Sequence, residues 1–282
     1  MNAESSGLRP RMMSVAYRML GSVVDAEDAV QDAFLRLQTA EDVSSPEGFL
    51  VKTTTRRCLD LLRADKRREK YVGPWVPEPV DTKVGAQTTV LSESLTQAFL
   101  LLLERLSPEE RAAFLLRTVF DYEYAAIAEI LGKTEVNVRQ IVSRARSRLE
   151  RDKLRFKPNE REAEKLAERF IAACRAGDVK LIEELITEDV EVHSDGGGKV
   201  TAARVIVRGR NLAARFLAGV FNKKRRHCEM RAATVNGEPG VMFTLGGNVI
   251  HVASFRIDGG IRAVYMTVNP DKLSRWSAAQ ID

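Results

Sequence analysis

The chain has 282 residues, which is enough for two domains or for three small ones, each with its own core. Hydrophobic residues make up 44% and charged residues 29%, with 18 glycines and 9 prolines, so the chain is neither collagen-like nor wholly disordered. The net charge of +5 is modest, so the placement of the charges says more about partners than their total.

The chain shows no sign of a membrane span or a structural metal site. No window approaches the roughly 18 consecutive apolar residues of a membrane span, and residues 1–10 lack a secretion signal pattern, so we expect a cytoplasmic location. The cysteines, Cys58, Cys174 and Cys228, are far apart and form no C-x-x-C pair. We expect reduced thiols, no metal and no cofactor.

The charges separate along the first 157 residues. Asp25 to Glu47 holds seven acids and one base, Lys52 to Lys70 holds eight bases and three acids, and Lys133 to Lys157 holds nine bases and three acids. Two separate basic stretches are the electrostatic pattern of a protein that binds phosphates in two places.

The N-terminal segment is predicted to be helical. Apolar residues recur at helical spacing up to Gly21, a second helix begins near Asp25, and a long helix runs from about Phe49 to Lys70. On a helical wheel, one sector of that long helix collects Lys52, Arg56, Asp60, Arg63, Lys66, Arg67 and Lys70. This sector is either a phosphate-binding face or a solvated charged face.

The segment from Gly73 to Gln87 is predicted to be a linker, because its prolines interrupt any helix. Helices resume at about Leu91, and Ser107-Pro108-Glu109-Glu110 is a helix start with a capping box. Residues 123–149 then match a helix-turn-helix with Gly132 in the turn.

The second helix of this motif has one apolar side and one polar side. The polar side carries Val136, Arg139, Gln140, Ser143, Arg144 and Ser147. Arginine and glutamine can reach base edges in a major groove, while Arg146, Arg148 and Arg151 can hold phosphates. The alternative is an ordinary helical bundle without DNA.

Beyond residue 157 the pattern is α+β with a mainly antiparallel sheet. Helices are predicted at 160–176 and 178–186, and strands at 190–193, 200–207, 241–245, 249–257 and 261–268. Asn236-Gly237, Gly246-Gly247 and Asp258-Gly259 are hairpin signals.

Several motifs together resemble extracytoplasmic-function sigma factors. Arg18 to Ser22 (RMLGS) and Asp25 to Arg36 (DAEDAVQDAFLR), followed by Phe49-Leu50 and Arg63, resemble sigma region 2. Leu106 to Arg111 (LSPEER), Ile127 to Gly132 (IAEILG) and Ser143 to Leu149 (SRARSRL) resemble region 4.

The resemblance implies site residues on three helices. Core RNA polymerase would be bound by Asp28, Gln31, Asp32 and Phe34, and the minus-ten promoter element by Lys52, Arg56, Asp60, Arg63, Lys66 and Arg67. The minus-thirty-five element would be bound by Arg139, Gln140, Ser143 and Arg144. Many relatives have Asn at the position of Arg56, so the promoter sequence does not transfer.

The remaining residues resemble a SnoaL-like, cone-shaped domain, found in one sigma subgroup. The order of two helices and then an antiparallel sheet carries this resemblance. Three motifs narrow it to the sigma subgroup: residues 75–79 (WVPEP), with Trp75 and Pro77; residues 195–199, which are Asp195, Gly196, Gly197, Gly198 and Lys199; and residues 269–273, which are Asn269, Pro270, Asp271, Lys272 and Leu273. The resemblance implies that the domain regulates the sigma factor in cis, in place of an anti-sigma protein. Because a large aromatic residue in a Pro-restrained segment can insert into a neighbouring domain, we expect Trp75 and the other two motifs to hold the domain against the linker.

The sequence thus predicts a multidomain fold: region 2 at 1–72, a Pro-rich linker at 73–90, region 4 at 91–156, both regions all-α, and an α+β SnoaL-like domain at 157–282. We expect a sigma factor that directs promoter-specific initiation and is not an enzyme. The available titratable groups, His193, His251, Asp195, Glu229 and Asp258, form no paired carboxylates at a suitable spacing. The alternative is a helix-turn-helix regulator fused to a domain that binds or converts a small molecule, and an unidentified small-molecule ligand remains open.

Overall fold

The computed structural model describes residues 3–65, 70–82, 96–150, 160–223 and 227–277. The chain divides into two compact units, one formed by residues 1–66 and 99–153 and the other by residues 67–98 and 154–282. The described part of the predicted linker, residues 73–82, falls in the second unit. Each unit is described by itself.

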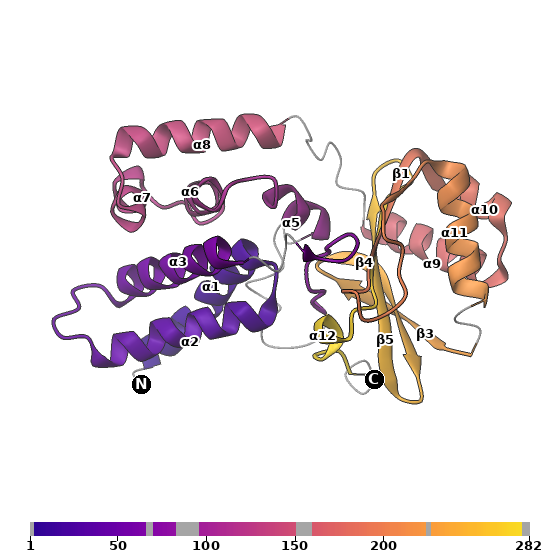
Figure 1. Ribbon diagram of the computed structural model, residues 1–282, viewed down its shortest axis with the longest axis horizontal. Coiled ribbons are helices and arrows are strands. Elements are labelled where there is room, and N and C mark those ends of the chain that lie inside the picture. The colour runs from indigo at the N-terminus through magenta and orange to yellow at the C-terminus, as the bar shows by residue number, and fades with distance from the viewer. Residues whose placement is uncertain (1–2, 66–69, 83–95, 151–159, 224–226, 278–282) are drawn as a thin grey trace. The chain divides into compact units, whose positions relative to one another are not determined.

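The first unit begins with three helices that pack on one another: α1 (Ala3–Leu20), α2 (Val23–Thr39) and α3 (Pro46–Ala64) (Figure 1). Ser22 and Ser45 cap the second and third helices by accepting hydrogen bonds from backbone N–H groups. The helix α3 ends at Ala64, earlier than the predicted Lys70, because Asp65 leaves the helical region of φ and ψ. These helices are called the α1–α3 group.

The same unit continues with α6 (Pro108–Thr118), α7 (Tyr124–Leu131) and α8 (Glu135–Glu150), here called the α6–α8 group. The predicted capping box is present, since the Ser107 and Glu110 side chains each accept a hydrogen bond from the other residue's backbone N–H. Gly132 ends α7 with φ of 65° and sets the turn into α8. These two helices form the predicted helix-turn-helix. The shorter α5 (Gln97–Leu103) precedes the group.

The second unit is built on one curved, six-stranded sheet of order β2-β1-β6-β5-β4-β3. The strands are β1 (Ile186–Asp195), β2 (Val207–Arg208), β3 (Glu229–Val235), β4 (Glu238–Leu245), β5 (Asn248–Ile257) and β6 (Ile261–Thr267). All neighbours are antiparallel except β1 and β6. The prediction of a strand over 200–207 was wrong except at its end, and Val205 is 72% exposed.

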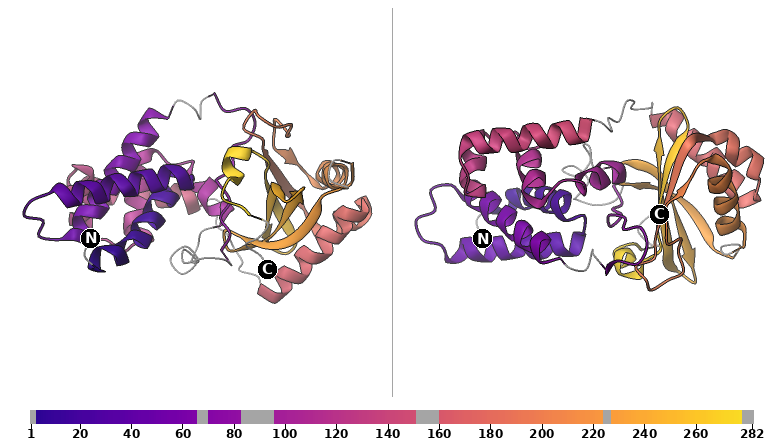
Figure 2. Two further views of the ribbon diagram at one scale, coloured as in Figure 1. Left: turned by 90° about the horizontal axis from the view of Figure 1, so that it is seen from below. Right: turned by 45° about the horizontal axis from the view of Figure 1, so that its top comes forward.

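Helices cover one face of this sheet: α9 (Glu160–Ala176), α10 (Val179–Leu185) and α11 (Arg210–Lys223) (Figure 2). Their apolar residues form the main core with Val241, Phe243 and Phe255 of the sheet. Alternate residues such as Met242 and Val252 point to the opposite face, where they pack with the short helix α12 (Pro270–Leu273) and residue 276. Residues 71–82 also pack against this second face.

Candidate functional site

The predicted duplex-reading face is the exposed side of α8. Its exposed residues are Val136, Asn137, Arg139, Gln140, Ser143, Arg144, Arg146, Ser147 and Arg148. The opposite side is buried, with Val138 and Ala145 fully covered. The Arg139 guanidinium pairs with Glu135 and lies 4.2 Å from the ring centroid of Tyr124. Arg151 lies outside the described residues.

The predicted minus-ten face of α3 contacts the α6–α8 group. Lys52 Nζ lies 2.8 Å from Glu129 Oε1, and Arg63 Nη2 lies 2.8 Å from Glu109 Oε1. Arg56 donates from Nε to the Ile130 carbonyl at 2.9 Å. The acid in this sector, Asp60, is exposed and lies 3.9 Å from Arg63, while Lys66 and Arg67 lie outside the described residues. No local sequence pattern indicated these contacts.

The acidic helix α2 presents part of the residue set predicted to bind polymerase. Asp28 and Gln31 are exposed, and Asp32 pairs with Arg57 of α3 at 3.0 Å. Phe34 was expected to lie on the surface, where it could contact polymerase. It is only 6% exposed, because its apolar ring packs in the core of the α1–α3 group.

The predicted interdomain residues meet at the carboxylate of Asp195, which is fully buried at the end of β1. Its Oδ1 accepts hydrogen bonds from the Tyr71 hydroxyl at 2.6 Å and the Gly197 N–H at 3.0 Å. Its Oδ2 accepts from the Val76 N–H at 2.9 Å and from Lys272 Nζ at 2.7 Å. Four donors on one buried carboxylate join the linker, β1 and α12, and we call this set the Asp195 junction.

Further contacts surround the junction. Asn269 donates to the Tyr71 hydroxyl at 3.0 Å and caps α12 by accepting from the Asp271 N–H. Lys272 also donates to the Val76 carbonyl, and its ammonium lies 4.3 Å from the Trp75 ring centroid. Burial and the nearby Asp195 raise the pKa of Tyr71 well above its usual value, so the hydroxyl remains a donor.

The three glycines allow the turn after Asp195 to approach its neighbours. Gly197 and Gly198 have φ of 59° and 74°, which favours glycine. A Cβ on Gly197 would lie 2.3 Å from Asn269 Nδ2, and one on Gly198 would lie 3.2 Å from Val72. Lys199 pairs with Asp271 at 2.6 Å on the surface.

Residues 76–79 of the linker are buried, whereas Trp75 is half-buried. Leu273 is buried beside Trp276, and Pro77 accepts a hydrogen bond from Gln97. Sequence reasoning missed Tyr71, Gln97 and Trp276, whose indole donates to the Pro79 carbonyl at 2.9 Å. Tyr71 and Trp276 are aromatic, but no other feature of the local sequence indicated that these three residues would form these contacts.

The residues considered for catalysis do not gather in one place. His193 pairs with Glu191 at 3.0 Å, and burial lowers the pKa of its ring. His251 stacks on Phe243 in the core, on the sheet face opposite to that of His193. Asp258 lies 3.5 Å from Arg262, and Glu229 lies 3.9 Å from Arg231. Within the described ranges, no group of three potential metal ligands is present.

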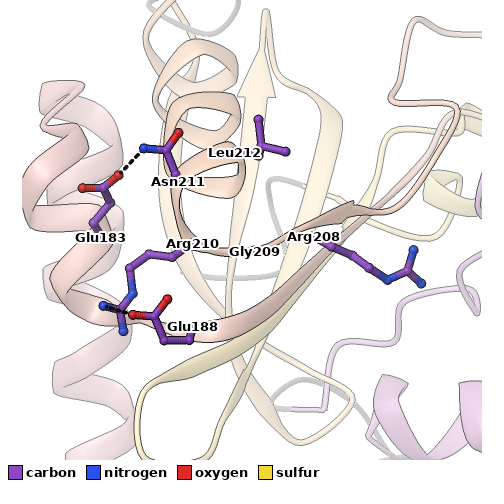
Figure 3. A pocket seen from close by; sticks show the side chains of 7 residues that line it. All are labelled: Glu183, Glu188, Arg208, Gly209, Arg210, Asn211 and Leu212. Carbon is purple, nitrogen blue, oxygen red and sulfur yellow. Dashed lines mark hydrogen bonds and ion pairs between the residues drawn. The ribbon is translucent and has the colours of Figure 1, made fainter.

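A pocket of about 410 Å³ lies where α11 begins, lined by Glu183, Glu188, Arg208, Gly209, Arg210, Asn211 and Leu212 (Figure 3). Arg210 pairs with Glu188 at 2.7 Å, and Asn211 donates to Glu183 at 3.3 Å. Arg208 pairs with Glu191 at 2.9 Å. Because these polar groups bind one another, the pocket gives no reason to assign a ligand.

Among the described helices, none is both long enough and apolar enough to cross a membrane.

Comparison with known proteins identifies three segments. Residues 6–68 match Sigma-70 region 2, residues 96–149 match Sigma-70 region 4, and residues 167–264 match a SnoaL-like domain. The chain is 35% identical to ECF RNA polymerase sigma factor SigJ of Mycobacterium tuberculosis, over 96% of this chain and 93% of the relative. It is 28% identical to the probable ECF sigma factor SigI of the same species, over 94% and 92%.

The fold agrees with these matches. A crystal structure of SigJ from M. tuberculosis superposes with a TM-score of 0.76 at 32% identity, over 96% of this chain and 98% of the other. The predicted fold class is therefore confirmed, with helical sigma domains followed by an α+β domain. Sigma factors are not enzymes. The chain belongs to the family of ECF RNA polymerase sigma factors, and it carries a SnoaL-like domain after its sigma regions.

Proposed function

We propose that this chain binds core RNA polymerase and promoter DNA, and that its SnoaL-like domain regulates initiation in cis by holding the linker between the two sigma regions. The exposed face of α8 reads the duplex minus-thirty-five element, because its arginine and glutamine side chains suit base edges in a major groove. The cationic face of α3 binds the melted minus-ten element, and the exposed acids of α2 bind polymerase.

The regulatory part of the proposal depends chiefly on one observation, the four hydrogen bonds that the buried Asp195 carboxylate accepts. Two of the donors, Tyr71 and the Val76 N–H, lie between the segments that match region 2 and region 4, residues 6–68 and 96–149. Further along, Asn236 exchanges hydrogen bonds with Val80, its N–H donating at 2.8 Å and its Oδ1 accepting at 3.0 Å. A linker held at several points leaves the sigma regions fewer relative positions than a free one.

Breaking the junction should release the linker. In Asp195→Asn the carboxylate is lost while the size of the side chain is kept, so Lys272 is left half-buried beside a neutral partner. The matched control is Asp189→Asn on the same strand, which removes an exposed carboxylate whose pairing with Arg262 is worth little.

The test is transcription in vitro from genomic DNA with core polymerase, comparing the unaltered chain, the two variants and a truncation that ends at Asn159. We expect promoter-specific transcripts from the unaltered chain, and a changed yield with Asp195→Asn and the truncation but not with Asp189→Asn. Absence of any specific transcript would contradict the sigma assignment. Equal yields from all four proteins would contradict regulation in cis while leaving the sigma assignment intact.

A further inference from the structure

Two arginines form a reciprocal contact between the α1–α3 group and the α6–α8 group. Arg56 of α3 donates to the carbonyls of Ile130 and Glu129, at 2.9 and 3.2 Å, in the last turn of α7. In return, Arg111 of α6 donates to the carbonyl of Met19 at 2.6 Å, in the last turn of α1. Each group therefore contributes a cation to the C-terminal end of a helix in the other.

Helix C-terminal ends are suitable partners for arginine. The last carbonyls of a helix lack intrahelical donors and carry the negative end of the helix dipole, so a cation there is stabilised. A guanidinium can donate to two carbonyls at once, as Arg56 does. Arg111 is 3% exposed and also pairs with Glu104 at 2.8 Å. Although burial lowers the pKa of Arg111 to about 10, the group remains charged at neutral pH.

Ion pairs lie beside the two arginine contacts. Glu129 pairs with Lys52, and Glu109 lies between Arg63 at 2.8 Å and Lys133 at 3.0 Å. At another point, Glu47 of the α1–α3 group accepts from the Tyr122 hydroxyl at 3.0 Å. Arg11 pairs with that same carboxylate at 2.7 Å and lies 5.2 Å from the Tyr122 ring centroid. The contact thus extends over α1, α3, α6 and α7.

These contacts affect the two predicted DNA faces differently. The cations Lys52, Arg56 and Arg63 of α3 are engaged by acids and carbonyls of the α6–α8 group. The outer side of α8, with Gln140 and Arg144, remains exposed. In this arrangement DNA phosphates have to compete with protein acceptors for the donors of the α3 cations.

We propose that the α3 cations form an intramolecular clasp on α6 and α7, and that the clasp must open before α3 can bind single-stranded DNA. Arg56 is then a positioning residue that holds the helix end of α7, in addition to any contact it makes with the promoter. The proposal goes beyond the proposed function, because it concerns how the two sigma regions hold each other.

The central variant is Glu129→Lys, which reverses the charge facing Lys52 and leaves every predicted DNA-binding side chain in place. Its matched control is Glu123→Lys, an identical change at an exposed position just before the same helix, where the acid lies 3.5 Å from Arg117 of its own group. The double variant Glu129→Lys with Lys52→Glu restores opposite charges across the clasp.

The first measurement is the distance between the two helix groups in the full chain, by energy transfer between dyes. Dyes are attached at Gln38→Cys in α2 and Ser147→Cys in α8, both exposed, in a Cys228→Ser background. We expect Glu129→Lys to lower the transfer efficiency, the double variant to restore it, and Glu123→Lys to leave it unchanged. Equal efficiency in all four proteins would overturn the clasp.

The second measurement is affinity for a dye-labelled single-stranded oligonucleotide of mixed sequence. Both lysine variants change the net charge equally, so a difference between them is not an effect of net charge. We expect Glu129→Lys to bind about threefold more tightly than Glu123→Lys. A clasp that covers the α3 face part of the time lowers the apparent affinity of that face in proportion. This arm rests on the proposed function and the distance arm does not. If energy transfer showed that the clasp opens but the two affinities were equal, the clasp would not block DNA. A failure to obtain specific transcripts in the transcription test would count only against the sigma assignment.

Discussion

The side chain of Asn269 occupies the space that a Cβ on Gly197 would need, since that atom would lie 2.3 Å from Asn269 Nδ2. Asn269 is 4% exposed and is held by Tyr71 and by the first turn of α12, so it has little freedom to move. The glycine at position 197 is therefore required by packing as well as by its φ of 59°.

Gly197→Ala should destabilise the second unit more than Gly246→Ala does. Both positions have positive φ, of 59° and 58°, and share the conformational cost of alanine there, about 1 to 2 kcal/mol. Only position 197 adds a clash, because nothing lies within 4 Å of a Cβ on Gly246. We expect a further loss of at least about 1 kcal/mol for Gly197→Ala.

Urea unfolding followed by tryptophan fluorescence measures this difference. The chain has two tryptophans, Trp75 and Trp276, and both belong to the second unit, so the signal reports on that unit. Equal free energies of unfolding for the two variants would show that Asn269 moves aside at no cost.

Arg144→Ala should weaken binding to the promoter duplex by about 1 to 3 kcal/mol and should change base preference at particular minus-thirty-five positions. The side chain is exposed on α8, so its removal leaves the core intact. The control is Arg215→Ala, which removes one exposed cation from α11. Selection of bound sequences from a random duplex pool measures the preference, and a weaker but unchanged preference would mean that Arg144 holds only phosphates.

Charge reversal on α2 should weaken binding of core polymerase. Asp28→Arg changes an exposed side chain, so we expect the fold to survive and the dissociation constant for core polymerase to rise about tenfold. Asp32→Arg should act in the same direction, and loss of its half-exposed pair with Arg57 should cost less than about 1 kcal/mol of stability. Glu41→Arg, beyond the end of α2, is the control. If all three variants bound alike in fluorescence anisotropy, α2 would not be part of the interface.

The elements with strong local signals were predictable from the sequence. The capping box of Ser107 and Glu110, the Gly132 turn and the hairpin at Gly246 are formed by residues close together in sequence. The contact of Trp276 with Pro79 and that of Arg56 with Ile130 span 197 and 74 residues. In both, the acceptor is a backbone carbonyl, which every residue carries, so the sequence pattern could not indicate it.

The strand predicted over 200–207 failed for a related reason. Its alternating apolar residues fit a strand, but only Val207 and Arg208 find partners, Val192 and Glu191 of β1. The preceding residues, 200–206, follow the turn at 196–199 and are not in a strand. Pairing between strands decides such cases, and periodicity alone does not report it.

Glu238, which is half-buried and has its Oε2 enclosed by protein, should make the stability of the second unit depend on pH. Burial raises the pKa of this carboxyl to about 8, although Arg256 and the Gln97 backbone act in the opposite direction. A pKa that is higher in the folded chain than the ordinary 4.5 means that the folded state holds a proton that the unfolded state releases. That contribution is complete below about pH 4.5 and is lost as the pH rises through about 8.

We therefore expect the free energy of unfolding to fall by about 2 kcal/mol between about pH 6.5 and about pH 8.5. The pKa of His193 is lowered below its ordinary 6.5 in the folded chain, so the unfolded histidine adds only a small opposite change at the lower end of this window. Glu238→Gln stays neutral at every pH and should show a much smaller fall, whereas Glu229→Gln, at an exposed position on β3, should behave like the unaltered chain. Urea unfolding followed by tryptophan fluorescence at the two pH values provides the comparison. The same fall in all three proteins would mean that Glu238 is ionised in the folded chain, with Arg256 compensating its charge.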